Sequence, residues 1–101
     1  MEIRELASLT NEVIDRVVPL LEDVPAATRD IASIRGANGA GEWLIALSNL
    51  VGVVAEEGVV ITAADHRDLK RLLDDFADSA SEDTRSEVAI ALSDLERITV
   101  G

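Results

Sequence analysis

The chain has 101 residues, 48% of them apolar, so it can bury one hydrophobic core and fits a single domain spanning residues 1–101. Its 20 acidic and 9 basic residues give a formal net charge of −11, and Trp43 and Phe76 are the only aromatic residues. This charge repels nucleic-acid phosphates, and two aromatic rings cannot form a stacking platform for bases, so nucleic-acid binding is disfavoured. We expect a basic partner instead, unless the negative charge only maintains solubility.

Several other kinds of site and location are disfavoured by the sequence. It contains no cysteine, which excludes disulfides, thiolate metal ligands and a cysteine nucleophile. The chain begins Met-Glu-Ile-Arg-Glu, with acids where a secretory signal has bases, and no run of about 18 apolar residues is present. We therefore expect a soluble, cytoplasmic protein that does not bind membranes.

The first helix is indicated by apolar residues at steps of three and four between Ile3 and Leu20, with acids interleaved. Pro19 cannot donate a hydrogen bond to the carbonyl of Asp15. We therefore expect this helix to kink or to end near Val18.

A short second helix is predicted after Asp23, which is placed to cap it, with Pro25 in the first turn. Its buried side would consist of Ala27, Ile31 and Ile34. The following segment 36–41 holds three glycines, so it should end the helix and form a mobile connection. It lacks the Gly-Lys-Ser/Thr of a Walker loop and follows no strand, which argues against nucleotide binding.

The third helix is predicted to begin about Gly41 and to end at a glycine C-cap at Gly58. Gly52 inside it suggests that a neighbouring backbone packs closely there. Residues 59–61 would form a short extended segment. The apolar face suits the centre of the domain and consists of Trp43, Leu44, Leu47, Leu50, Val51 and Val54.

The fourth helix starts at a capping box in which the Thr62 hydroxyl and the Asp65 carboxylate would both bind free amides. A final helix is predicted from about Ser81. The expected buried residues are Leu69, Leu72, Leu73, Phe76 and Ala80 in the fourth helix, and Val88, Ala91, Leu92, Leu95 and Ile98 in the last. The elements together predict an all-α bundle of four to five helices.

The sequence offers little support for catalysis, a cofactor or a metal site. The only histidine, His66, has no carboxylate at helical spacing, and we interpret it as an exposed helix residue. The acidic stretch 74–87 lacks the alternating ligands and the glycine of a calcium loop. Ser93 lacks the preceding Gly-Asp of the serine that carries the prosthetic group in acyl carrier proteins. We therefore expect no enzyme.

An acidic surface is the remaining candidate site. Asp75, Asp78 and Glu82 fall with Asp68 on the outer face predicted for the fourth helix, and Asp74 and Asp83 flank them. Arg71 is spaced to pair with Asp75. A simple solvated face would have the same pattern, so charge alone does not identify a partner.

A more specific indication comes from residues 40–76, about a third of the chain. The informative residues are Gly41-Glu42-Trp43, Ala46-Leu47, Leu50, Val54, Glu57-Gly58-Val59, Ile61-Thr62 and Asp65. This pattern resembles the small helical immunity proteins of bacterial polymorphic toxin and contact-dependent inhibition systems, including MafI-like proteins. Those proteins usually carry acids where this chain has Ser48 and Gly52. The resemblance implies a cytoplasmic protein that sequesters a cognate toxin, often a nuclease with a basic cleft.

Our hypothesis is that an acidic surface contacts the toxin. Trp43 would anchor the bundle or serve as a partly exposed interface residue, and Glu42 would cap or orient the third helix. The alternative function is a self-associating helical module, with Val53, Val59 and Val60 as its apolar patch. The candidate partner-binding residues are Asp75, Asp78, Glu82 and Asp83, with Glu56 and Glu57.

Overall fold

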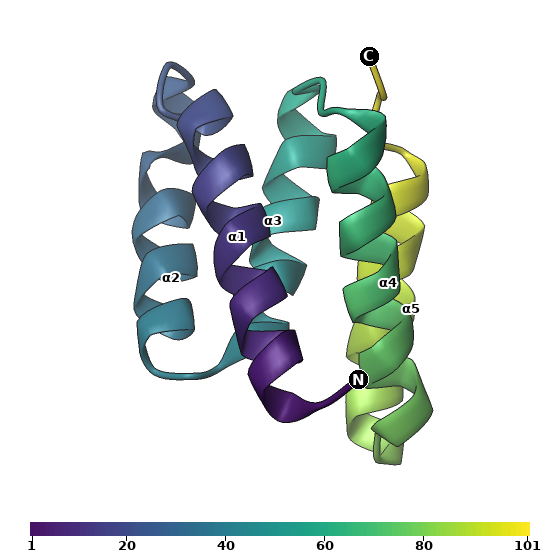
Figure 1. Cartoon of the computed structure of the whole chain (residues 1–101). Coiled ribbons are helices and arrows are strands. Elements are labelled where there is room, and N and C mark those ends of the chain that lie inside the picture. The colour runs from purple at the N-terminus through teal and green to yellow at the C-terminus, as the bar shows by residue number, and fades with distance from the viewer.

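A computed structural model describes all residues 1–101 and contains five α-helices that run alternately up and down along the bundle (Figure 1). This confirms the predicted all-α fold. None of the helices is both long and apolar enough to cross a membrane. The helices are α1 (Ile3–Leu21), α2 (Thr28–Gly39), α3 (Trp43–Glu57), α4 (Ala63–Ser79) and α5 (Glu82–Glu96), with a 3-10 turn η1 (Pro25–Ala27) before α2.

The central helix is α3, which packs against all four other helices. Its predicted apolar face is confirmed, although Trp43 and Leu44 in the first turn are only half-buried. The fully buried residues of α3 include Ala46, Leu47, Leu50, Val51 and Val54. In α4 and α5 the buried face is also as predicted, with Phe76 and Leu92 half-buried at its margins. Ala80 is half-buried directly after the end of α4.

The predicted end of the first helix near Val18 is wrong, because α1 continues through Pro19 to Leu21. Proline removes one backbone donor, but its φ angle suits a helix. Val17, Val18 and Leu21 are buried, and this burial holds the last turn in place.

The glycine-rich segment is also more helical than its composition predicts, since α2 extends to Gly39. Only Gly41 in this segment has a positive φ, of 75°. Its amide donates to the Asn38 carbonyl at 3.1 Å and the Glu42 amide donates to the Ala37 carbonyl at 2.8 Å, which is a Schellman motif. The connection is therefore a defined helix cap that covers only residues 40–42, and the prediction that the helix ends where the glycine-rich segment begins is wrong.

At two helix starts the observed capping interactions differ from those predicted. Asp23 does not cap the second helix, because η1 intervenes and the N-cap positions are Val24 and Ala27, without side-chain capping bonds. At α4 the Thr62 hydroxyl accepts from the Asp65 amide at 3.1 Å, as predicted. The Asp65 carboxylate does not complete the capping box, because it accepts a hydrogen bond from Arg16 of α1.

The remaining glycines separate into one confirmed and one incorrect prediction. Gly58 ends α3 at a φ of 65°, as expected. Gly52 is not approached by a backbone: a Cβ there would lie 3.7 Å from a carboxylate oxygen of Asp94 in α5. The segment after Gly58 forms no sheet, and Ile61 makes a single bridge to Val100.

Candidate partner-binding surface

Three exposed acids gather where α4 ends and α5 begins, at the end of the bundle where α3 starts (Figure 1). Asp78 lies in the last turn of α4, whereas Glu82 and Asp83 lie in the first turn of α5. None of the three has a cationic group within 4.0 Å. We call Asp78, Glu82 and Asp83 the acidic end.

The other predicted acids of this region are already paired. Asp75 accepts a hydrogen bond from the Met1 amine at 2.8 Å, and this bond raises the pKa of the amine. Asp74 accepts from Lys70 at 2.8 Å, and Asp68 from Arg16 at 2.9 Å. The predicted pairing of Arg71 with Asp75 is therefore wrong.

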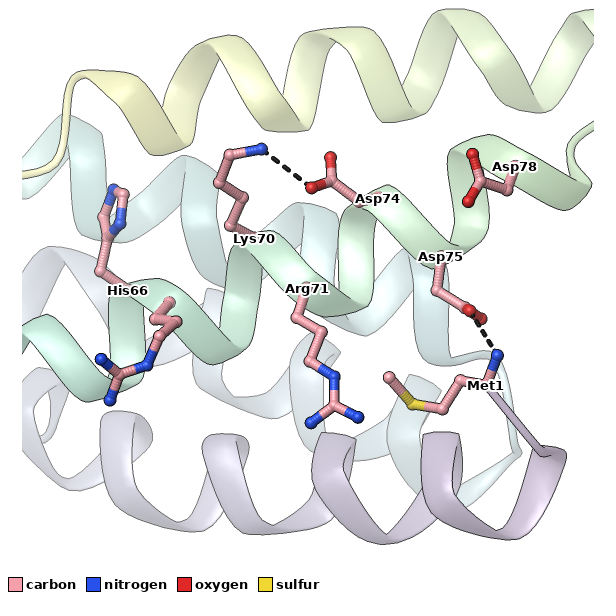
Figure 2. Close-up of a pocket in the computed structure, with 8 residues that line it drawn as sticks. Met1, His66, Lys70, Arg71, Asp74, Asp75 and Asp78 are labelled. Atoms are coloured by element: carbon pink, nitrogen blue, oxygen red, sulfur yellow. Dashed lines mark hydrogen bonds and ion pairs between the residues drawn. The ribbon is translucent and has the colours of Figure 1, made fainter.

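The groove along α4 shows how these charges are arranged (Figure 2). Its first half carries His66, Arg67, Lys70 and Arg71, and its second half carries the acids, with Arg71 turned toward α1 and no interaction drawn at Asp78. The outer face of α4 is thus divided by charge, and the prediction of one acidic face from Asp68 to Glu82 is wrong. Because α4 ends at Ser79, Glu82 belongs to the next helix.

This order of charges opposes the helix dipole, which favours acids at the N-terminus and bases at the C-terminus. No helix in the chain carries a base in its last turn. Asp78 therefore lies where it weakens α4, unlike Glu82 and Asp83, which suit the start of α5. Helix stabilisation does not explain why an acid is present at Asp78.

The predicted pair Glu56 and Glu57 does not join the acidic end. Both are exposed in the last turn of α3, and α3 begins at the end of the bundle where α4 finishes. They therefore lie at the opposite end (Figure 1). The sequence could not reveal this separation, because it depends on the direction in which each helix crosses the bundle.

His66 is half-buried, so its predicted exposure is wrong. Its Nε2 lies 3.1 Å from the Leu95 carbonyl oxygen, which can only accept, so Nε2 is the donor of this hydrogen bond. Its side chain points toward α5 in Figure 2. No three acidic or histidine side chains are grouped as a metal site would require.

An apolar hollow of about 340 Å³ lies between the start of α3 and the adjoining ends of α4 and α5. We call it the aromatic hollow because it contains both aromatic side chains of the protein. Its lining consists of Gly41, Glu42, Trp43, Leu44, Ile45, Phe76 and Thr84. Sequence reasoning singled out Trp43 but missed Ile45 and Phe76 as surface residues. The available signal was the position of Ile45 outside the buried face of α3.

Glu42 occupies the N-cap position of α3, but its side chain makes no capping hydrogen bond, so the predicted side-chain cap is wrong. Its backbone carbonyl accepts from the Ala46 amide at 3.1 Å, and its side chain is exposed beside the hollow. Glu42 therefore contributes a negative charge to this surface without stabilising the helix through a side-chain cap.

The patch proposed for self-association is not a continuous apolar surface. Val53 is 5% exposed and belongs to the core, Val59 is half-buried, and only Val60 is half exposed, at 50%. The apolar residues of this segment are mostly used inside the protein.

The fold and this surface define a small all-α bundle with an acidic end beside an aromatic hollow. The chain belongs to a protein family of unknown function, DUF6189, whose family model matches residues 1–101. The searches of curated proteins and of solved structures found no match.

Proposed function

We propose that this protein is a cytoplasmic immunity protein that binds and neutralises a cognate bacterial toxin, with the acidic end as part of the contact. The observation that carries the proposal is that Asp78, Glu82 and Asp83 are exposed at one end of the bundle without a cationic partner. A toxin that cleaves nucleic acid must bind polyanions, so its cleft is basic and complements such a surface.

The position of Asp78 supports this proposal over simple solubility. An acid in the last turn of a helix is unfavourable, whereas an acid elsewhere would add the same solubility without weakening α4. Groups that reduce stability are commonly retained where they serve binding. The resemblance of residues 40–76 to toxin immunity proteins supports the same function.

The proposal is tested by co-expressing the chain with the C-terminal domain encoded by the adjacent upstream gene in a laboratory host. We expect the chain to restore growth that this domain inhibits, and to form a complex with it that weakens as salt rises. If the domain is not toxic, or its toxicity is unchanged by the chain, the proposal is overturned.

Matched variants test the acidic end. The test variant is Asp78→Asn/Glu82→Gln/Asp83→Asn, and its control removes the same number of charges at the opposite end with Asp23→Asn/Glu56→Gln/Glu57→Gln. We expect association with the toxin domain to slow by about 10-fold or more at low salt in the test variant only. Equal slowing in both variants would show a general effect of net charge.

A further inference from the structure

We propose that the aromatic hollow is the anchor of the partner contact and receives an arginine side chain of the basic partner protein. This inference rests on the proposed function and adds the chemistry of the recognised group. It concerns a surface formed by three helices, with Trp43 and Ile45 from α3, Phe76 from α4 and Thr84 from α5.

The large side chains of the hollow are incompletely covered and lie together, with both aromatic rings of the protein among them. The aliphatic side chains of the α3 core, such as Leu47 and Leu50, are fully buried, whereas Trp43 and Phe76 are half-buried and Ile45 is 43% exposed. An aromatic ring that is fixed on one side and open on the other is typical of interface hot spots.

Negative charge borders this apolar floor at Glu42. Glu42 lines the hollow directly and has no cationic partner. Thr84 also lines it, and Asp83 and Glu82 directly precede Thr84 in the first turn of α5. The hollow therefore has an apolar floor with the Glu42 carboxylate at its edge, and Asp83 of the acidic end is one residue away from its lining.

Arginine is the side chain that matches both parts. Its three-carbon stem packs on apolar groups, its planar guanidinium stacks on an indole face, and its charge pairs with carboxylates in two directions. Lysine can supply the charge but not the flat, bidentate group. A neutral apolar side chain would fill the hollow but leave Glu42 and Asp83 unpaired.

A second copy of this chain is a poorer occupant. A symmetric contact at this surface would bring Glu42 and the acidic end of one copy against those of the other, in a protein whose net charge is −11. Like charges facing one another in this way oppose association.

The first experiment uses the single tryptophan as an internal reporter. The ¹⁵N-labelled protein is titrated at low salt with the capped peptide acetyl-Gly-Arg-Leu-Arg-Gly-amide, and with peptides in which citrulline or lysine replaces both arginines. Amide and indole chemical shifts and Trp43 fluorescence are recorded. We expect saturable shifts at Trp43, Ile45 and Thr84, with an apparent Kd about 5-fold or more weaker for the neutral citrulline peptide.

The variants assign this binding to the surface. Glu42→Gln/Asp83→Asn should weaken binding of the arginine peptide, raising its Kd by about 5-fold or more. Glu56→Gln/Glu57→Gln, which removes the same charge, should leave this Kd unchanged. The inference is overturned by an absence of saturable shifts, by equal binding of the citrulline peptide, or by shifts centred on the Glu56 end. It is also overturned if sedimentation shows a stable dimer that buries Ile45.

The growth assay separates this inference from the proposed function. Ile45→Ser changes a 43% exposed side chain and should not disturb the core. If wild-type protein protects the host and Ile45→Ser and Phe76→Leu, both shown to be folded by circular dichroism, protect equally well, the anchor is wrong and the function stands. If wild-type protein does not protect, the function is wrong, and the peptide titration alone decides the chemistry of the hollow.

Discussion

Arg16 of α1 and Asp65 of α4 form a hydrogen-bonded ion pair, with Arg16 Nε donating to Asp65 Oδ1 at 2.7 Å. The Asp65 side chain is 7% exposed, whereas that of Arg16 is 45% exposed. The hydrogen bond to Asp65 raises the pKa of Arg16. The pair holds the first helix against the start of α4 and is best tested by substitution.

We predict that Arg16→Met lowers the free energy of unfolding by about 1–2 kcal/mol, because it leaves the buried Asp65 carboxylate without its donor. This magnitude already allows for solvent screening at the partly exposed Arg16 side chain. Urea unfolding measures the change. The control is Arg35→Met, which breaks an exposed pair with Glu22 and should have an effect of about 0–0.5 kcal/mol. Equal losses would mean that burial of Asp65 does not matter.

The cap of α4 gives a second prediction. Thr62→Ala removes the acceptor of the Asp65 amide and should destabilise the protein by about 1 kcal/mol. The matched control is Ser81→Ala at the start of α5, where the hydroxyl contacts the Thr84 hydroxyl and caps no amide. Thermal unfolding should show a larger loss of stability for Thr62→Ala than for Ser81→Ala. The reverse order would contradict the assigned caps.

The glycines give a third prediction: replacement by alanine should stabilise the protein at one position and destabilise it at two others. Gly36 is helical and an added Cβ would meet nothing within 4 Å, so Gly36→Ala should stabilise the protein by about 0.5–1 kcal/mol. Gly41→Ala and Gly58→Ala should each destabilise it by about 1–2 kcal/mol, because both positions have positive φ. Chemical denaturation of the three variants checks this, and a loss at Gly36 would imply that the segment is not helical.

The helices could be predicted from the sequence because each must bury one apolar stripe, and that stripe is visible as a 3.6-residue period. The ends of the helices were harder to predict from the sequence. Proline and glycine weaken a helix locally, but whether the helix stops there depends on the burial of residues such as Leu21 and on where the chain must reverse, as at Gly41. Local propensity does not contain either quantity.

The candidate surface was only partly predictable for a related reason. The sequence identifies the acids but not their partners, which come from distant segments: Asp65 bonds to Arg16, and Asp75 to the Met1 amine. Likewise, the aromatic hollow joins Trp43 with Phe76 across two helices. Which acids remain free for a partner therefore depends on tertiary packing.

The last prediction concerns the conflict between stability and binding at Asp78. Since Asp78 lies in the last turn of α4 without a cationic partner, Asp78→Asn should raise the free energy of unfolding by about 0.3–1 kcal/mol. Glu82→Gln, in the first turn of α5, should lower it by a similar amount, since it removes a charge that the helix dipole favours. Both variants should weaken the proposed toxin complex. Urea unfolding at low salt measures stability, and stopped-flow association measures binding. If Asp78→Asn destabilises the protein, the acid at this position is structural, and the case that it is retained for a partner is lost.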